Sequence, residues 1–346
     1  MERSENLSSQ MATAADPVVK VTLSVVLCTY NRAPRLASVI KTLADFPGAP
    51  GLAHEIIVVD NNSTDETRAM IEAAVARQPD RIRYVFEGRQ GLSWARNRGI
   101  EAARGELIAF TDDDVVVDPG WIAAMARAAV DYPHAGFGGR VWPVWDFEPP
   151  PWFVGGGRFH MLKGGVIVGH NLGDDPIEYK RGMYSIVGAN MAFRRRLFER
   201  VGLFRTDLGK TGKRAFFGED ADMFVRALAA GEPLLYLPQA VIYHPVDREK
   251  MTQRHFVVSY FNLGRSIARF GQRYPPQAVR YFGVPRYLVR MLIGHIGRGT
   301  VAAITGQYKI MLHHLFESCW LAGQVLETAR WGAPRSEERQ AETVDR

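Results

Sequence analysis

The chain has 346 residues, enough for one large α/β domain or two smaller ones, and its 47% hydrophobic and 23% charged residues are ordinary values for a folded protein. Its two cysteines, Cys28 and Cys319, exclude a disulfide framework and indicate a reducing compartment. No run of the sequence reaches the roughly 18 uncharged apolar residues that a membrane-spanning helix needs.

Residues 1–19 are polar and acidic and lack the apolar segment of a secretory signal, so we expect a disordered leader there. After it, short apolar runs alternate with segments whose apolar residues recur at helical spacing. This alternation predicts a parallel sheet with helices on both faces. The expected strands are 21–27, 55–59, 82–86 and 107–110, and the expected helices are 34–43, 66–76, 92–103 and 119–130.

The second half of the chain is less regular. Residues 138–176 are rich in Gly, Trp and Pro, which indicates irregular structure over the sheet rather than a linker. From Gln253 the pattern is helical, with breaks at Pro275-Pro276 and Pro285, and from about Trp331 it is polar. Between these regions we expect strands at 183–193, 234–237 and 241–243 and helices at 194–201 and 219–230.

Positive charge gathers in the helical region. The net charge is +6, yet no Asp or Glu occurs between Glu249 and Glu317, where Lys and Arg recur among aromatic residues. A solvated basic surface is the simplest interpretation. Each Lys or Arg near an anionic leaflet adds about 1 kcal/mol, however, which favours a surface that faces lipid or polyphosphate. No nucleic-acid motif accompanies the charge, so we expect no nucleic-acid partner.

Polar clusters follow three of the expected strands, at 29–32, 60–65 and 112–114. Parallel sheets bind ligands at the carboxyl ends of their strands, so the three clusters together predict a binding site.

The third cluster is an acidic triplet, Asp112, Asp113 and Asp114. Adjacent carboxylates repel one another, and a divalent cation with oxygen ligands, Mg²⁺ or Mn²⁺, removes that repulsion. Mg²⁺ usually takes one or two carboxylates and completes its shell with substrate phosphates, so the triplet suggests a bound diphosphate. The alternative is that Asp113 or Asp114 caps the next helix, for which Asp118 is better placed.

Five stretches of the chain, in the family's order, resemble family 2 glycosyltransferases of the GT-A fold: SVVLCTYNR, EIIVVDNNSTDET, GLSWARNRGIEAARGELIAFTDDDV, GANMAFRRRLFERVGLF and FFGEDADMFVRALAAG. They run from about Ser24 to His244, and their combination is specific, although DDD alone would not be. The resemblance implies an α/β, Rossmann-like GT-A fold, with a mixed sheet covered by helices on both faces and a C-terminal helical extension.

The resemblance also suggests domain boundaries. We expect a GT-A domain at 20–248, with a nucleotide-binding half at about 20–135 and an acceptor half at about 136–248. A basic helical region at 249–330 and a flexible tail at 331–346 would follow.

The same resemblance implies which residues bind a nucleotide-sugar donor. Asp60 would accept hydrogen bonds from the nucleobase, Arg96 and Asn97 would lie near the phosphates and sugar, and Asp112 would reach the ribose and donor sugar. The full donor-binding set is Thr29, Tyr30, Asn31, Arg32, Asp60, Asn62, Arg96, Asn97, Asp112 and Asp113.

For the metal, Mn²⁺ or Mg²⁺, the resemblance implies Asp114 and Asp112, with His244 completing the shell. Because three aspartates stand in a row, the register shifts by one if Asp113 is the ligand, and Asp113 stays a candidate. A lone histidine is more often structural, and this reading of His244 stays open.

GEDAD contains an acidic pair, Glu219 and Asp220. In this family the pair lies beside the acceptor, and the resemblance implies that Asp220 is the general base with Glu219 at its side. A carboxylate within hydrogen-bond reach takes the proton of an acceptor hydroxyl as the new bond forms. Capping of a helix N-terminus is the alternative role, and Asp222 is a weaker candidate.

On the acceptor side, the resemblance implies contacts from Gly188, Ala189 and Asn190, where small residues let the backbone approach a ligand. Trp142 is a candidate for stacking on a sugar face, as are Trp145 and Trp152, with core packing as the equal alternative.

We therefore expect an inverting, metal-dependent glycosyltransferase that moves a sugar to a hydroxyl of a saccharide or lipid-linked saccharide in cell-surface or exopolysaccharide biosynthesis. The alternatives are a nucleotidyltransferase, which usually carries a Gly-rich basic loop after its first strand, and a non-catalytic nucleotide-sugar-binding module. A processive synthase would have a Gln-any-any-Arg-Trp motif and membrane spans, and this sequence has neither.

Residues 281–296 mix apolar side chains with Arg286, Arg290 and His295, as an interfacial helix does. We expect a cytoplasmic protein that is peripheral at the inner face of the cytoplasmic membrane, with membrane contact through 250–316. A homodimer interface on the same helices is the alternative.

Overall fold

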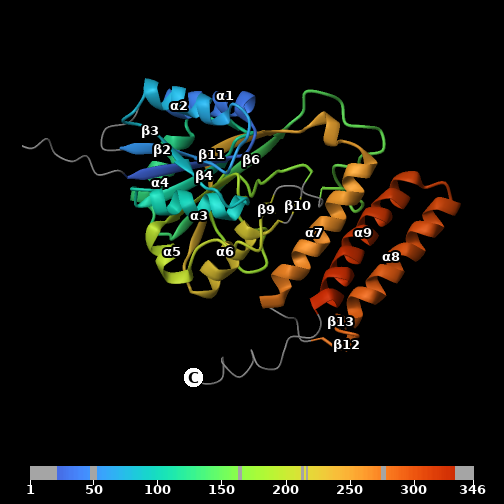
Figure 1. The fold of residues 1–346 in the computed structure, drawn as a ribbon. Helices are drawn as coiled ribbons and strands as arrows, with labels where there is room; N and C mark the ends of the chain where they lie inside the picture. Colours follow the sequence, from blue (N-terminus) through green and yellow to red (C-terminus); the bar gives the residue numbers. More distant parts are fainter. Residues whose placement is uncertain are drawn as a thin grey trace, which may run out of the picture.

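A computed structural model (Figure 1) describes residues 22–46, 53–162, 166–211, 214–215, 217–273 and 278–331. The expected leader, the expected tail beyond Trp331 and the expected break at Pro275-Pro276 lie outside the described residues. A sheet with helices on both faces forms the N-terminal part, and a group of long helices lies beside it. The predicted α/β GT-A-like architecture with a C-terminal helical extension is confirmed.

The central sheet is mixed. Within the described residues it has nine strands, eight of them in the order β3-β2-β1-β4-β8-β6-β11-β5, with β7 paired to β11. Strands β1 to β4 are mutually parallel where they pair, β8 is antiparallel to β4 and β6, and β11 is parallel to β6. The strands are β1 (Leu23–Thr29), β2 (His54–Asp60), β3 (Ile82–Phe86), β4 (Leu107–Asp112), β5 (Val116–Val117), β6 (Gly136–Val144), β7 (Ile177–Glu178), β8 (Asn190–Arg194) and β11 (Leu234–Pro245).

Helices cover both faces because side chains alternate along the strands. Val25 of β1 packs in the core under α1, α2 and α4, whereas the next residue, Val26, packs in the core under α3, α5 and α6. Both strand residues are completely buried. The helices are α1 (Ala33–Ala44), α2 (Thr67–Arg77), α3 (Leu92–Ala102), α4 (Trp121–Asp131), α5 (Arg195–Val201) and α6 (Glu219–Ala229).

The prediction of irregular structure was wrong at the start of 138–176, because β6 occupies the middle of the sheet. The glycines of β6 suggest a loop in the sequence, but in the structure neighbouring atoms leave no space for a side chain at these positions. A Cβ at Gly139 would overlap the Ala240 carbonyl and the Asn190 amide, and one at Gly138 would overlap the Tyr179 hydroxyl. The expected strand at 183–193 begins only at Asn190.

The two short strands expected at 234–237 and 241–243 form a single strand, β11, whose register shifts between Leu237 and Val241. This bulge lets one strand pair with β6 along its whole length.

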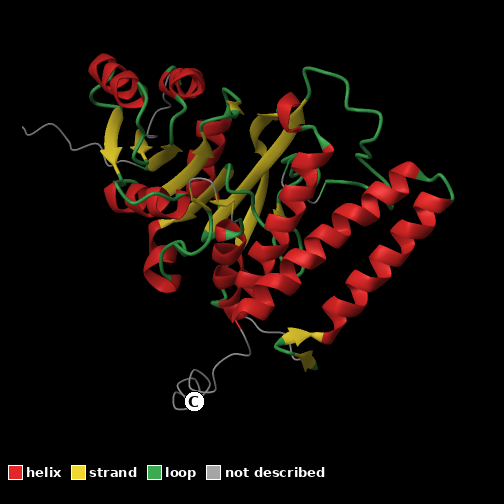
Figure 2. Cartoon of the chain, turned by 45° about the vertical axis from the view of Figure 1, so that its right-hand side comes forward, coloured by secondary structure: helices red, strands yellow, loops and turns green. Residues whose placement is uncertain are grey.

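Three long helices follow β11 through a short 3₁₀ turn at Arg248–Lys250. Figures 1 and 2 show α9 between α7 and α8, so that α8 is the outermost helix. The helices are α7 (Gln253–Arg273), α8 (Arg286–Ile304) and α9 (Tyr308–Trp331), and two small hairpins accompany them, β9 (Lys210–Thr211) with β10 (Arg214–Ala215) and β12 (Arg280–Tyr281) with β13 (Val284–Pro285). No helix in the described part of the chain has the length and apolar character needed to cross a bilayer.

An aromatic cluster joins this helical region to the segment that follows β6. Trp152 packs edge-on against Phe256 of α7, with ring centroids 5.1 Å apart, and also against Phe316 of α9. Trp145 packs in the same cluster. Trp145 and Trp152 therefore serve core packing rather than an open sugar site.

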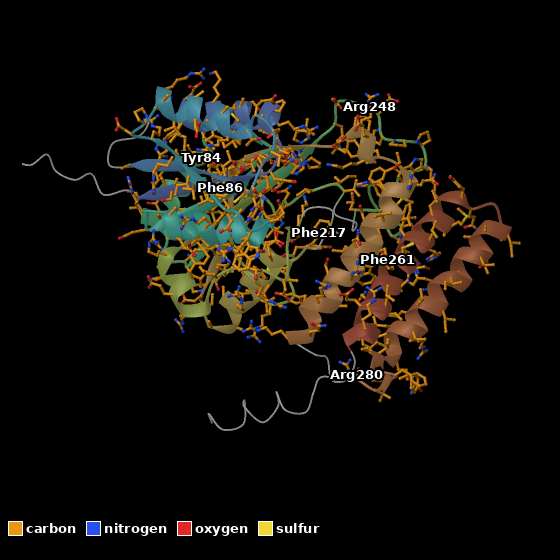
Figure 3. The ribbon with its side chains drawn as sticks, viewed as in Figure 1. Tyr84, Phe86, Phe217, Arg248, Phe261 and Arg280 are labelled. Carbon is orange, nitrogen blue, oxygen red and sulfur yellow. The ribbon has the colours of Figure 1, made fainter. Side chains whose placement is uncertain are left out.

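Helices α7 and α9 touch through their backbones at two glycines. A Cβ at Gly264 would overlap the Trp320 carbonyl, and a Cβ at Gly323 would overlap the Phe261 carbonyl. Phe261 is labelled on α7 in Figure 3. The axes can approach this closely only because both positions lack side chains.

We expect Gly264→Ala to destabilise the protein by about 1–3 kcal/mol, because the added methyl group meets backbone that cannot move aside. Gly271→Ala on the same helix is the control. Its Cβ meets nothing, so its higher helix propensity should stabilise by up to about 1 kcal/mol. Urea unfolding of both variants measures the difference, and equal stabilisation by the two substitutions would contradict the close contact.

Candidate active site

A pocket lies where β1 and β4 end. In the sheet register Cys28 is opposite Asp112, and Thr29 is opposite Asp60, so the turns after β1, β2 and β4 meet at one edge. Six of the residues predicted for the site line this pocket: Thr29, Tyr30, Arg32, Asp112, Asp113 and Asp114.

Asparagines build the two turns that flank the pocket. Asn31 and Asn62 have positive φ angles of 52° and 63°, a conformation that asparagine tolerates better than most residues. The Asn31 backbone N–H donates to the Ser63 hydroxyl (3.0 Å), and the Asn31 side-chain oxygen accepts from the Thr64 N–H (2.8 Å). The turns after β1 and β2 are therefore tied together, and both asparagines shape the loops.

The three carboxylates of the acidic triplet have different partners. The Thr29 hydroxyl donates to Asp113 (2.7 Å), the Arg32 guanidinium lies 3.3 Å from Asp114, and the Arg96 guanidinium lies 3.5 Å from Asp112. Burial raises the pKa of Asp113 to about 6, and the charges of its neighbours in the triplet add to the effect. The strand end thus crowds three carboxylates together, with Arg32 and Arg96 as neighbouring cations.

Asp114 and His244 are the best-placed residues for a divalent cation. Burial works to raise the pKa of Asp114, but nearby His244, Arg32 and Lys210 outweigh it and lower the pKa below its usual value. The His244 Nε2 lies 3.8 Å from Asp114, and its Nδ1 lies 3.2 Å from the Pro245 carbonyl. The neutral tautomer with its proton on Nδ1 would present the Nε2 lone pair to a cation.

Asp114 and His244 fit a cation whose remaining ligands come from a substrate and from water. Among the described residues, no three or more His, Cys, Asp or Glu side chains are arranged to hold a metal by themselves. Asp114 and His244 supply one oxygen and one nitrogen ligand, which leaves positions for diphosphate oxygens and water, as Mg²⁺ and Mn²⁺ prefer.

Arg96 joins the acidic triplet to the acidic pair. This side chain on α3 is only 2% exposed; one guanidinium nitrogen donates to Glu219 (2.6 Å), and the other lies 3.5 Å from Asp112. The resemblance implies a position for Arg96 near the donor phosphates and sugar. In the structure it is a buried cation between two groups of carboxylates.

Asp220 is held by backbone donors. Its two carboxylate oxygens accept from the Gly188 and Ala221 N–H groups, each at 2.8 Å. Burial, with the charge of Glu219, raises the pKa of Asp220 to about 6, although Arg96 and the two N–H groups act to lower it. A Cβ at Gly188 would lie 2.7 Å from the Arg96 guanidinium, so the approach of these groups requires glycine there.

Three residues predicted for donor or acceptor contacts are engaged elsewhere. Asp60 accepts from the Ser63 N–H (2.9 Å) and the Tyr84 hydroxyl (3.2 Å), and it does not line the pocket. Figure 3 labels Tyr84 on β3. The Asn97 amide bonds in both directions to the Phe204 backbone, at 2.9 Å each.

The Asn190 side chain bonds to the backbone of neighbouring strands and does not line the pocket. Its amide nitrogen donates to the Arg140 and Ala240 carbonyls (2.9 and 2.8 Å), and its oxygen accepts from the Trp121 indole (2.8 Å). No side-chain donor of Asn190 is left for a sugar.

The remaining residues predicted for the acceptor side differ in their exposure to solvent. Ala189 is buried, and Asp222 is buried in an ion pair with Arg226 (2.7 Å). Trp142, by contrast, is 40% exposed beside Arg140, whose guanidinium lies 5.6 Å from the indole ring.

Six pocket-lining residues are not among the predicted ones: Cys28, Asn61, Gln90, Leu92, Ala95 and Lys210. Cys28 and Asn61 lie inside stretches that carried the resemblance, so position after a strand was an available signal. Lys210 lies in a short hairpin far along the chain, and no periodicity marks it.

Comparisons with known proteins agree with this geometry. The sequence pattern described as Glycosyl transferase family 2 matches residues 24–202. The chain is 27% identical over 248 residues to the succinoglycan biosynthesis protein ExoM of Rhizobium meliloti, covering 71% of this chain and 74% of that protein. It is 28% identical over 225 residues to the glucosyl-dolichyl phosphate glucuronosyltransferase of Haloferax volcanii, covering 64% and 68%.

The fold also resembles a solved structure, the mannosyltransferase PcManGT from Pyrobaculum calidifontis in complex with GDP-Man and Mn²⁺. The TM-score is 0.51 at 18% identity, over 98% of this chain and 84% of that one. At this identity the likeness shows the shared fold.

We expect Arg96→Met to destabilise the protein by about 3–5 kcal/mol, because it leaves Glu219 buried and unpaired. Adding Glu219→Gln should recover part of that loss. Arg98→Met on the same helix, where the ion pair with Glu101 is exposed, should cost no more than about 1 kcal/mol. Additive effects of the Arg96 and Glu219 substitutions in urea unfolding would contradict the buried link.

Proposed function

Because the chain belongs to glycosyl transferase family 2 and is a glycosyltransferase, we propose that it moves a sugar from a nucleotide-sugar to an acceptor hydroxyl with inversion at the anomeric carbon. One observation carries this proposal. Two groups of carboxylates, the acidic triplet and the acidic pair, lie on either side of the buried Arg96 guanidinium. One group suits a donor diphosphate and the other an acceptor hydroxyl.

The donor diphosphate would occupy the pocket beside the acidic triplet. Arg32 and Lys210 bring positive charge to this pocket, where the negative charge of the leaving group develops. Asp114 and His244 would hold the divalent cation, with Asp112 and Asp113 as the neighbouring oxygen donors. When bound, Mn²⁺ or Mg²⁺ neutralises charge on the departing nucleoside diphosphate.

Asp220 would act as the general base. The acceptor hydroxyl donates to an Asp220 oxygen, the acceptor oxygen bonds to the anomeric carbon, and the bond from that carbon to the diphosphate breaks. The proton ends on Asp220. A pKa of about 6 makes this carboxylate a stronger base than an ordinary aspartate while leaving it ionised at neutral pH. Attack from the face opposite the leaving group inverts the anomeric centre.

Glu219 would act through Arg96. Its ion pair with the guanidinium fixes the first turn of α6, so that the Asp220 carboxylate is held against the Gly188 N–H. Gly188 and the exposed Trp142 remain the acceptor-side candidates.

The named relatives support an acceptor in glycan assembly. One is described as a succinoglycan biosynthesis protein and another as a glucosyl-dolichyl phosphate glucuronosyltransferase. We infer that this chain glycosylates a saccharide or lipid-linked saccharide in cell-surface or exopolysaccharide biosynthesis. A lipid-linked acceptor would require the enzyme to work at the inner face of the cytoplasmic membrane.

We expect Asp220→Asn to lower kcat by about 10²–10⁴, because the acceptor proton loses its base. The donor would first be identified by screening nucleotide-sugars for Mn²⁺-dependent hydrolysis. Thermal protection of the variant by UDP or GDP with Mn²⁺ should persist, since Asp220 does not line the donor pocket.

The pH profile supplies a second test. Because the base must be ionised, kcat/KM should fall about tenfold per unit as the pH drops below about 6, the pKa of Asp220. Asp174→Asn, at an exposed carboxylate, is the control and should behave as wild type. Full turnover by Asp220→Asn would point to another base, whereas absence of turnover in the wild type would favour a non-catalytic module.

A further inference from the structure

The outer face of α8 is apolar and uncovered. Ile293, Val301 and Ile304 are 65%, 60% and 80% exposed, and at the hairpin tip before the helix Phe282 is fully exposed. Monomeric proteins rarely leave a large apolar surface open unless it contacts something. We call this the α8 face, defined by Tyr281, Phe282, Arg286, Tyr287, Arg290, Met291, Ile293, Ile296, Arg298, Val301 and Ile304.

The exposure follows from the order of the helices. The buried residues of α8 are Leu288 and Ala302, and Leu288 packs in one apolar cluster with Leu321 of α9. The opposite side carries residues that recur at helical spacing: Arg286, Arg290, Ile293, Val301 and Ile304. Nothing in the described part of the chain covers that side (Figures 1 and 2).

The charge on this face has one sign. Arg286, Arg290 and Arg298 are exposed there, and no acidic residue occurs between Glu249 and Glu317. Two arginines of α7 differ, because Arg265 and Arg269 both form ion pairs with the buried Glu327, at 2.7 and 2.6 Å, whereas Arg254 and Arg273 at the ends of that helix are exposed. Within the region expected to be basic, 250–316, the exposed arginines are most numerous on α8.

We propose that the α8 face docks on an anionic lipid bilayer, with α8 lying in the plane of the interface. The apolar side chains and the Phe282 tip enter the acyl boundary, and the arginines bind lipid phosphates. A symmetric dimer through this face would oppose the arginines of one copy to those of the other, with no carboxylate on the face to pair them. Because the charged side chains of the α8 face are all positive, anionic lipid suits this face better than a second copy of the chain does.

Docking also deepens the proposed function, on which this step rests. The helices leave the sheet at the carboxyl end of β11, the edge that bears His244. The Phe217 N–H, one residue before Gly218 and the acidic pair, donates to the Ser266 hydroxyl of α7 (3.0 Å). Figure 3 shows Phe217 between the sheet and α7, and Arg280 at the hairpin end of the helical region. The helical region that α8 would hold at the membrane is therefore linked through α7 to the segment that carries the acceptor carboxylates, which suits a lipid-linked acceptor.

The test is co-sedimentation of the full chain with vesicles of phosphatidylcholine, alone or mixed with phosphatidylglycerol. Wild type should bind the mixed vesicles and lose binding as salt rises. Arg286→Gln with Arg290→Gln and Arg298→Gln should weaken binding about tenfold or more, as should Phe282→Ser with Ile293→Ser and Ile304→Ser.

Control variants carry changes of the same two kinds elsewhere. Arg77→Gln with Arg104→Gln and Arg127→Gln removes equal charge from exposed sites, and Phe86→Ser with Val130→Ser removes exposed apolar groups. Phe86 is labelled on β3 in Figure 3, far from α8. Both controls should bind vesicles as wild type does.

Mn²⁺-dependent nucleotide-sugar hydrolysis separates this inference from the proposed function. The α8-face variants should keep that activity, which also shows that they fold. Hydrolysis together with no binding to the mixed vesicles would overturn the docking and leave the transferase intact. If the wild type binds lipid but hydrolyses no nucleotide-sugar, and the α8-face variants lose the lipid binding, the result would support docking and count against the transferase. A wild-type dimer that only these variants dissociate, without vesicle binding, would overturn it in favour of a second copy.

Discussion

The site depends on one electrostatic constraint: two groups of carboxylates, Asp112 to Asp114 at the end of β4 and the pair Glu219 and Asp220 at the start of α6, lie on either side of one guanidinium. Like charges this close raise the free energy of the folded state unless cations intervene. Arg96 is the buried guanidinium between the two groups, and Arg32, Lys210 and His244 lie near Asp114. A divalent cation held together with the donor diphosphate would complete this compensation on the donor side.

This constraint explains local features that look unrelated. Gly188 lacks a side chain because the Arg96 guanidinium and the Asp220 carboxylate occupy the space beside it. The backbone N–H of Gly188 then offsets part of the repulsion at Asp220. Thr29 ends β1 where its hydroxyl can donate to Asp113. Each feature adds a donor near a carboxylate that burial would otherwise protonate.

Much of the N-terminal fold could be predicted, because strands buried on both faces are continuous apolar runs and their helices are amphipathic. Strand β6 could not, since Gly138 and Gly139 carry no apolar signal and are needed only because Asn190 and Tyr179 press against them. The acidic triplet could be predicted as part of a site because the carboxyl ends of parallel strands lie at the same edge of a sheet. The link from Asp112 through Arg96 to Glu219 spans more than 100 residues of sequence and exists only in three dimensions.

The central claim is that the acidic triplet tolerates its crowding through a divalent ion shared with a pyrophosphate. Isothermal titration of Mn²⁺ into the protein, alone and with saturating UDP or GDP, tests it directly. The account predicts weak binding alone, binding at least about tenfold tighter with one of the diphosphates, and loss of that gain in Asp114→Asn but not in Asp118→Asn. Mn²⁺ affinity that neither diphosphate changes, or that Asp114→Asn leaves intact, would contradict it.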